Sequence, residues 1–209
     1  TYWGALGDSI TAGTGAGGTS YSYANVAGNL IGANVHNHGI AGSCINAGYN
    51  LALTDPGYED AFCNRYTQMA DGLDLITVLG SVNDHRADSK IGVEGSTSKE
   101  DFYGALHVLI TGLKQKYPNG RIVFITPFKI GGYDGRNLYG HTLTDFRNAI
   151  VTMCNKHKLE VLDLFTVQEF EWLRGANTGY FVPYDYYHPT VEGHQAIANY
   201  LVQQMFGGT

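Results

Sequence analysis

The amino-acid sequence predicts a three-layer α/β/α sandwich, in which helices cover both faces of a central, mainly parallel sheet of five strands. Short apolar segments rich in β-branched residues alternate with longer amphipathic segments along the chain. Strict alternation of strand and helix requires crossover connections, which produce a parallel sheet covered on both faces. The 209 residues hold about five such units, too few for an eight-fold barrel. We therefore expect residues 1–209 to form a single domain, which is compatible with excision from a longer protein.

Five segments have the character of strands. The clearest runs from Leu73 to Leu79, which is apolar, rich in β-branched residues and bounded by Gly72 and Gly80. This pattern is typical of a strand buried on both faces. The first strand is expected to end at Gly7. The expected strands cover residues 2–6, 33–38, 73–79, 121–126 and 159–164.

Four further segments are expected to form helices. Between the last strands, apolar residues recur at spacings of three and four over residues 102–113 and 143–153, which predicts two amphipathic helices. Another helix is expected over residues 21–31. The last one is expected to begin at Pro189, because proline is favoured at the first helical position, and to run through Met205.

The composition excludes several classes of protein. Apolar residues make up 44% and charged residues 15% of the chain, which is typical of a folded domain and not of a disordered one. The net charge is −6, so the chain offers no basic surface for a nucleic-acid partner. No apolar run approaches the roughly 18 residues that a membrane span needs. We therefore expect neither a nucleic-acid partner nor a membrane span.

Three cysteines without a Cys-x-x-Cys pair argue against a disulfide scaffold and against a structural zinc site. Cys44 and Cys63 flank a segment rich in Gly, Asn and Asp. The sequence is compatible with a disulfide between these two cysteines, and equally with two separate buried thiols. Cys154 falls on the apolar face of a predicted helix and is expected in the core.

The loop after the first strand contains Gly7, Asp8 and Ser9. Asp and Ser are common in turns and before helices, so a capped turn would explain them. A serine on a sharp strand-to-helix turn can also be a nucleophile, with its own N–H free to bind an anion. These three residues by themselves are compatible with either interpretation.

A carboxylate and an imidazole lie three residues apart before the last predicted helix, at Asp185 and His188. Pro189 disfavours the α conformation for the residue that precedes it, so His188 is expected at the helix cap. A carboxylate so close can hold the imidazole in one tautomer and stabilise its protonated form. An ordinary surface Asp–His pair is the alternative.

Two further loops offer hydrogen-bond donors without charge. The loop after the second strand contains Asn37, Gly39 and Gly42, and the loop after the third strand contains Asn83. A tetrahedral oxyanion needs two or three donors aimed at one point, and glycine N–H groups and an asparagine amide can supply them. All these loops belong to the carboxyl edge of the predicted sheet, where ligands bind in this architecture. Their coincidence favours a catalytic site over unrelated turns.

Other motifs indicate less. Residues 13–18 have the form of a dinucleotide-binding fingerprint, but they begin several residues after the strand and no acidic residue ends the second strand, so we expect a flexible loop. His36 and His38 have no carboxylate or cysteine placed with them and are expected to be structural. His194, within the last helix, is expected to pack or cap.

The blocks Gly-Asp-Ser, Asn-x-Gly-x-x-Gly, Asn-Asp and Asp-x-x-His-Pro follow one another in this order, and as a set they resemble the SGNH hydrolases, also called GDSL-type esterases and lipases. The resemblance spans nearly the whole chain and implies a flavodoxin-like fold. It implies Ser9 as the nucleophile, His188 as the general base and Asp185 as its partner. The oxyanion hole would comprise the N–H groups of Ser9 and Gly42 and the side chain of Asn83. No metal or organic cofactor is implied.

The chain departs from the family pattern at two positions. Ile10 stands where the family often has Leu, which should matter little. Ser81 stands where the third block usually has Gly, which could narrow the loop that aims Asn83.

The resemblance implies a small-molecule or glycan ester as the substrate, from a range that includes lipids, small acyl esters and acetylated sugars. Tyr supplies 15 of the aromatic residues, and tyrosines in loops would suit stacking on sugar rings. We therefore expect a serine esterase that removes O-acetyl groups from carbohydrate, with His85, Tyr186 and Tyr187 in contact with the substrate. The other loop tyrosines considered are Tyr21, Tyr23, Tyr49, Tyr133, Tyr180 and Tyr184.

Two alternatives stay open at this point. One is a lipid or lysophospholipid acyl hydrolase, and the other is a non-catalytic carbohydrate-binding module of a larger surface or virion protein. The sequence leaves the oligomeric state undetermined.

Overall fold

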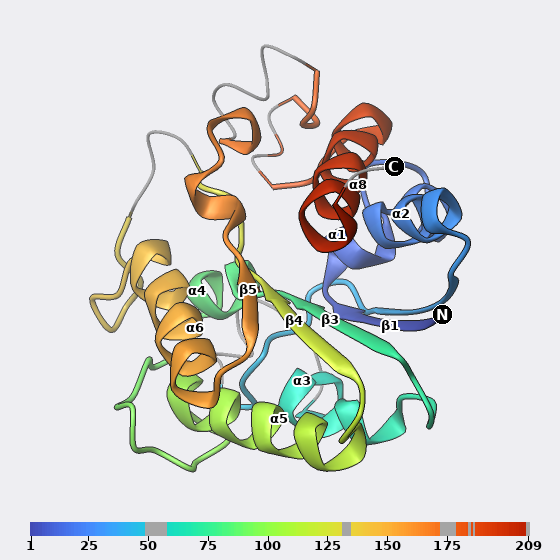
Figure 1. The fold of residues 1–209 in the computed structure, drawn as a ribbon. Helices are drawn as coiled ribbons and strands as arrows, with labels where there is room; N and C mark the ends of the chain where they lie inside the picture. The colour runs from blue at the N-terminus through green and yellow to red at the C-terminus, as the bar shows by residue number, and fades with distance from the viewer. Residues whose placement is uncertain (49–57, 131–134, 172–178, 184, 186, 208–209) are drawn as a thin grey trace.

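A computed structural model of the chain describes residues 1–48, 58–130, 135–171, 179–183, 185 and 187–207. Its centre is a five-stranded sheet in the order β2-β1-β3-β4-β5, and every neighbouring pair is parallel (Figure 1). The strands are β1 (Tyr2–Gly7), β2 (Asn34–Gly39), β3 (Leu75–Leu79), β4 (Arg121–Ile125) and β5 (Glu160–Leu162). The predicted α/β sandwich with a parallel sheet is confirmed.

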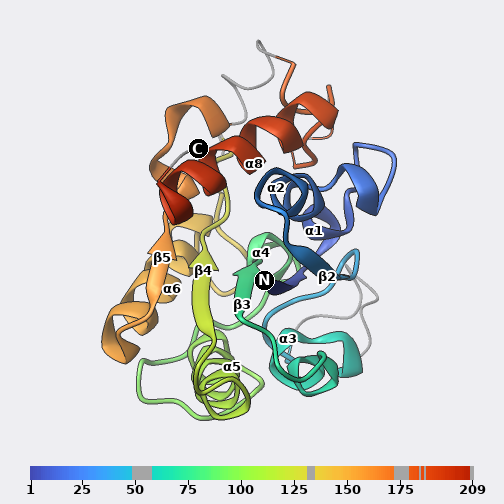
Figure 2. The same cartoon turned by 45° about the vertical axis from the view of Figure 1, so that its right-hand side comes forward.

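Helices cover both faces of this sheet (Figure 2). One face packs against α2 (Tyr23–Ile31) and α8 (Val191–Phe206), and the other against α3 (Phe62–Arg65), α5 (Phe102–Lys116) and α6 (Leu143–His157). Two short helices, α1 (Ser9–Ala12) and α4 (Val82–Arg86), directly follow β1 and β3 at the carboxyl edge of the sheet. Short 3-10 turns occur at Thr19–Tyr21, Tyr58–Asp60, Tyr66–Gln68, Leu164–Thr166 and Gln168–Phe170.

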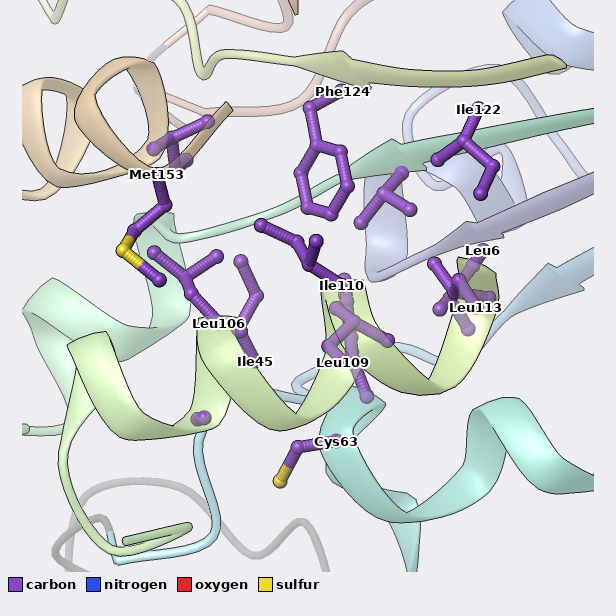
Figure 3. Close-up of a cluster of buried hydrophobic side chains, with 14 of the residues drawn as sticks. Leu6, Ile45, Cys63, Leu106, Leu109, Ile110, Leu113, Ile122, Phe124 and Met153 are labelled. Atoms are coloured by element: carbon purple, nitrogen blue, oxygen red, sulfur yellow. The ribbon is translucent and has the colours of Figure 1, made fainter. Parts of the chain in front are cut away.

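The strand pleat divides the apolar side chains between two cores. In β3, Leu75 and Leu79 pack towards α2 and α8, whereas Ile76 and Val78 pack towards α5 and α6. All five residues of β3 are buried, which confirms the prediction of a strand covered on both faces. Figure 3 shows the second core, in which Phe124 of β4 lies above the apolar face of α5. Fully burying one such side chain contributes about 1.5–3 kcal/mol of transfer free energy.

The start of the last helix differs from the prediction. The helix begins at Val191 and not at Pro189, because the hydroxyl of Thr190 caps it by accepting a hydrogen bond from the N–H of Gly193 at 3.2 Å. Pro189 instead forms an antiparallel bridge with Phe181, whose side chain is buried against Phe128. His188 therefore lies two residues before the helix cap, in a loop anchored to the core, and not at the cap itself.

The other boundaries shift by a few residues. The helix predicted over residues 21–31 begins at Tyr23, because the side chain of Ser22 caps it by accepting from the N–H of Asn25. The last strand is only three residues long, and the chain turns into a 3-10 helix at Leu164.

The three cysteines are free and buried. Of the two possibilities for Cys44 and Cys63, the structure therefore has two buried thiols and not a disulfide. Burial raises the pKa of Cys63 to about 12, so this thiol stays protonated and unreactive at neutral pH. Cys154 lies on the buried side of α6, in the core that this helix shares with α5, as expected.

His194 connects the two helices on one face of the sheet. Its Nδ1 accepts a hydrogen bond from the backbone N–H of Tyr23, the first residue of α2, at 3.1 Å. The two rings stack with centroids 6.4 Å apart. The residue therefore packs and caps, but it caps α2 and not its own helix. Burial lowers the pKa of His194 to about 4.

Exchanging His194 for asparagine is expected to remove one component of the dependence of stability on pH. The asparagine oxygen can still accept from Tyr23. In the native chain His194 stays neutral down to about pH 4, whereas in the unfolded chain it binds a proton near pH 6.5. Between pH 6.5 and pH 4 the unfolded state therefore binds more protons than the native state. The wild-type protein loses stability as the pH falls through this range.

Urea titrations at several pH values check this expectation. The free energy of unfolding of the wild type minus that of His194→Asn should decrease between pH 6.5 and pH 4. A difference that stays constant over this window would contradict it.

Candidate active site

Ser9 lies where β1 turns into α1. Asp8 precedes the helix, and its Oδ1 accepts a hydrogen bond from the N–H of Ile10 at 3.0 Å. Ser9 is the first residue of α1, so its own N–H has no acceptor within the helix. Burial raises the pKa of Asp8 to about 6, despite the bond from Ile10 and the nearby positive charges. The turn thus presents a hydroxyl and a free N–H from one residue.

His188 and Asp185 approach Ser9 from the loop that precedes α8. Nε2 of His188 lies 2.8 Å from Oγ of Ser9, and Nδ1 lies 2.9 Å from Oδ2 of Asp185. The other carboxylate oxygen, Oδ1, accepts from the backbone N–H groups of Tyr187 and His188. The loop is fixed to the core by the bridge between Phe181 and Pro189.

The charge of Asp185 is stabilised in place. Burial raises the pKa of Asp185, but the hydrogen bonds from the side chain and backbone of His188 and from Tyr187 outweigh it, so the pKa lies below its ordinary value. An ionised carboxylate fixes which imidazole nitrogen carries the proton and leaves the other free to accept one from a serine hydroxyl. The three side chains can therefore activate Ser9 for attack on a carbonyl carbon.

Gly15, in the glycine-rich loop at residues 13–18, packs closely against His188 and Pro189. A Cβ atom at Gly15 would lie 2.5 Å from the carbonyl oxygen of Pro189 and 3.0 Å from Cβ of His188. Only glycine fits this close approach. The loop at residues 13–18 therefore packs against the histidine loop, and a dinucleotide is not needed to explain its glycines.

A cavity of about 190 Å³ opens beside Ser9. Its lining comes from α1, the loop after β2, α4 and the loop before α8, and includes Ser9, Gly42, Asn83, Arg86, Tyr187 and His188. Its volume is below the roughly 300–1,000 Å³ typical of sites for drug-sized ligands. The described part of the site therefore fits a small group.

Two further hydrogen-bond donors line this cavity, one from the loop after β2 and one from α4. Gly42, with φ of 79°, adopts the left-handed conformation that glycine favours, and its N–H makes no hydrogen bond to any other described residue. Asn83 on α4 uses one N–H of its side-chain amide to bind the carbonyl oxygen of Ser43 at 3.0 Å. Since an amide nitrogen carries two hydrogens, the second remains for a ligand. Together with the N–H of Ser9, these groups can stabilise a negatively charged oxygen.

Asp84 holds the loop that carries Gly42. Its carboxylate is fully buried and accepts from the backbone N–H groups of Ile45 and Asn46 and from the side chain of Asn46. Burial raises the pKa of Asp84 to about 6, against the lowering effect of these bonds. Asp84 thus ties the Gly42–Asn46 loop to α4. A carboxylate next to Asn83, shortly after a buried strand, was a signal of this role in the sequence.

Arg65 joins the same loop to the sheet, and nothing in the sequence distinguished it. Its guanidinium is buried and donates to the carbonyl oxygens of Gly7 and His38, at 2.6 Å each, and to the hydroxyl of Ser43 at 3.2 Å. A further bond reaches the carbonyl of Asp60. Burial lowers the pKa of Arg65 to about 10, so it stays charged at neutral pH. One side chain therefore connects the ends of β1 and β2 with the Gly42–Asn46 loop.

Ser81 is strained. It precedes α4 with φ of 96°, a left-handed conformation that costs an ordinary L-residue about 1–2 kcal/mol. Its Oγ is buried and has no hydrogen-bond partner among the described residues. Ser81 stands where the family pattern has Gly. The turn that orients Asn83 keeps its conformation with serine, but the strain of that conformation lowers the stability of the protein.

Exchanging Ser81 for glycine is therefore expected to raise the free energy of unfolding by about 1 kcal/mol, since relief of strain exceeds the entropy that glycine adds to the unfolded chain. Ser81→Ala is the matched control, because it removes the unpartnered hydroxyl but keeps Cβ. Urea unfolding of both variants separates the two causes. Equal stabilisation by alanine and glycine would contradict backbone strain as the cause.

Several predicted contact residues lie elsewhere. His85 does not line the cavity: its Nε2 lies 2.8 Å from the carbonyl oxygen of Gly135, and its ring packs edge-on against Phe146. Tyr23 is buried in the core and cannot stack on a ligand. Tyr187 does line the cavity. Tyr186 lies outside the described residues, as do Tyr49, Tyr133 and Tyr184.

The imidazoles of β2 give no sign of a metal centre. Burial lowers the pKa of His38, whose carbonyl oxygen binds Arg65. Within the described ranges no three His, Cys, Asp or Glu side chains are grouped to hold a metal ion. Nor does any helix in the described part of the chain have the length and apolar character to cross a membrane.

The chain is similar to proteins of one family. A model of the GDSL-like lipase/acylhydrolase family matches residues 5–196. A protein of known structure from Lactobacillus plantarum is 30% identical, with a TM-score of 0.83, and the match covers 100% of this chain and 98% of that one. A possible lipase from Chitinophaga pinensis is 19% identical, with a TM-score of 0.73 and coverage of 100% and 99%.

A family two carbohydrate esterase from Clostridium thermocellum, solved in complex with cellohexaose, is 19% identical, with a TM-score of 0.66. That match covers 99% of this chain and 64% of the esterase chain. No curated protein sequence matches the chain.

Proposed function

Since the chain belongs to the GDSL-like lipase/acylhydrolase family, we propose that it is a serine esterase in which Ser9 is the nucleophile, His188 the general base and Asp185 its partner. The observation that carries the proposal is the pair of hydrogen bonds that His188 makes at the wall of a cavity: Nε2 accepts from the hydroxyl of Ser9 at 2.8 Å, and Nδ1–H donates to the carboxylate of Asp185 at 2.9 Å. An ordinary surface Asp–His pair would have no reason to meet a serine 179 positions away.

The reaction takes place in two halves. Nε2 of His188 accepts the proton of the Ser9 hydroxyl as Oγ attacks the ester carbonyl carbon. The oxyanion that forms is stabilised by the N–H groups of Ser9 and Gly42 and by the Asn83 amide. Collapse of this intermediate expels the alcohol, which takes the proton from His188, and leaves an acyl group on Ser9. Water, deprotonated by the same imidazole, then releases the acid.

We propose small acyl esters as the substrates, and O-acetyl groups on carbohydrate first among them. The volume of about 190 Å³ supports a short acyl group, and Tyr187 beside the cavity offers a ring for stacking on a sugar. A lipid acyl hydrolase would need room for a long apolar chain, which the described lining does not offer.

Hydrolysis of 4-nitrophenyl acetate and 4-nitrophenyl octanoate by the wild-type protein at neutral pH tests the reaction and the chain length together. We expect kcat/KM to be higher for the acetate ester. In a second assay, we expect the protein to release acetate from an acetylated oligosaccharide. Preference for the octanoate would contradict the small acyl group. Absence of turnover by the folded protein would contradict the esterase and favour a non-catalytic carbohydrate-binding module.

A further inference from the structure

Arg86 lies beside the proposed catalytic residues. It is the last residue of α4, the same short helix that carries Asn83, and its exposed side chain lines the cavity with Ser9 and His188. Residues three apart on a helix face the same side, so Asn83 and Arg86 reach the cavity together while His85 between them faces Phe146. The helix thus presents a neutral donor and a cation to one cavity.

The guanidinium of Arg86 differs from the other arginines in the described residues. Arg65, Arg121, Arg136 and Arg147 all donate hydrogen bonds to carbonyl or carboxylate oxygens of the protein. Arg86 makes no hydrogen bond and no ion pair with any residue that the structure describes. Its five N–H donors are therefore available to a ligand.

Tyr187 fixes where this cation lies. The guanidinium carbon of Arg86 is 4.3 Å from the centroid of the Tyr187 ring, in the geometry of a cation–π contact. Tyr187 is itself held, because its ring packs against the cluster of Val82, Ile130 and Leu143 and its N–H binds Asp185. The ring occupies one side of the guanidinium, whose N–H groups have no hydrogen-bond partner among the described residues and can bind a ligand.

The charges around the cavity favour an anionic ligand for this guanidinium. Asp8 is the one carboxylate among the described lining residues, and it is 1% exposed with its Oδ1 bound to Ile10. Asp185 is bound to His188. An unpaired guanidinium in a protein of net charge −6 is therefore not neutralised by its own surroundings. The planar fork of arginine matches carboxylate, phosphate and sulfate oxygens.

We propose that Arg86 forms an anion subsite and that the preferred substrates are esters carrying a carboxylate or another oxyanion close to the scissile bond. The assignment deepens the proposed function and rests on it, since it names the class of ester that the same site accepts. Tyr187 acts as a positioning residue that holds the guanidinium at the cavity.

The first test measures binding and needs no turnover. The Ser9→Ala protein is titrated with two matched pairs of probes: 3-acetoxybenzoate against 3-acetoxybenzamide, with the anion on the alcohol portion, and monomethyl glutarate against dimethyl glutarate, with the anion on the acyl portion. We expect the anionic member of at least one pair to bind about tenfold more tightly, as is typical of a charge-assisted hydrogen bond. The pair that shows the preference identifies the side on which the anion lies.

Arg86→Gln in the same background should abolish that preference and leave the neutral probes unaffected. Lys90→Gln is the control for net charge, because Lys90 is exposed and stacks on Tyr139 outside the cavity; it should retain the preference. Equal binding of anionic and neutral probes in both pairs, or a preference that survives Arg86→Gln, would overturn the proposal.

Steady-state kinetics of the protein with Ser9 intact distinguishes two roles for Arg86: an anion subsite, and a structural contact that only holds α4 against the histidine loop. A subsite predicts that Arg86→Gln raises KM for the anionic ester of the preferred pair about tenfold with little change for its neutral partner. An equal fall in kcat/KM for both esters would identify Arg86 as a clamp between α4 and the histidine loop, and would also overturn the proposal. If no ester is hydrolysed, the esterase assignment fails and the binding measurement still decides the anion subsite.

Discussion

Replacing Ser9 with alanine is expected to lower kcat for 4-nitrophenyl acetate by about 10⁴-fold or more, as is typical when a serine nucleophile is removed. The oxyanion donors and the cavity remain, but no atom is left to form the acyl intermediate. The fold should be unaffected, because the hydrogen bond from the N–H of Ile10 to Asp8 remains and Ser9 Oγ makes a hydrogen bond only to His188 among the described residues.

Parallel measurements make this result decisive. The midpoint of thermal unfolding reports whether Ser9→Ala is folded, and Ser20→Ala, which removes an exposed hydroxyl from the nearby 3-10 turn, is the matched control. We expect full activity in the control. A folded Ser9→Ala protein that retains more than about a tenth of the wild-type rate would remove Ser9 from the mechanism.

Exchanging Arg65 for methionine is expected to destabilise the protein by about 3–5 kcal/mol, the range for removing a buried charged group that satisfies several partners. Methionine preserves the apolar stem, whereas the bonds to the carbonyl oxygens of Gly7 and His38 and to Ser43 are lost together. The ends of β1 and β2 and the Gly42–Asn46 loop then lose their shared connection. Urea unfolding at neutral pH measures the loss.

Arg121→Met is the control for this experiment. Arg121 makes two bonds to Glu160, but both side chains are substantially exposed, at 36% and 51%. Exposed ion pairs contribute about 1 kcal/mol or less. If Arg65→Met cost no more than Arg121→Met, the buried guanidinium would have no special role in holding the loops.

The scaffold was predictable because burial on both faces leaves a local mark in the sequence. Every residue of β3 is apolar or a buried threonine, so the strand could be identified without knowledge of its neighbours. The sequence was less informative at the ends of elements. Pro189 has the conformational preference of a first helical residue, yet pairing with Phe181 draws it into the histidine loop, and Thr190 caps the helix instead.

The short helix α4 illustrates how one turn of backbone changes the interpretation of a motif. His85 was expected at the substrate because it follows Asn83 and Asp84 in the sequence. The helical period instead turns His85 towards Phe146 and brings Arg86 to the cavity. Tyr23 is a similar case: hydrogen bonding to Thr11 and contact with His194 bury a side chain that was expected in a loop.

The family, the parallel sheet and the loops that bear the reactive groups were predictable from the amino-acid sequence, because these depend on residue types that follow one another at fixed spacing. The contacts between separate segments are visible only in the folded chain: Ser9, Asp185 and His188 lie within hydrogen-bond distance, Arg65 joins three segments, and Arg86 has no hydrogen-bond or ion-pair partner among the described residues. Contacts of this kind depend on how separate loops are brought together by packing of the sheet and helices, and no local pattern encodes them.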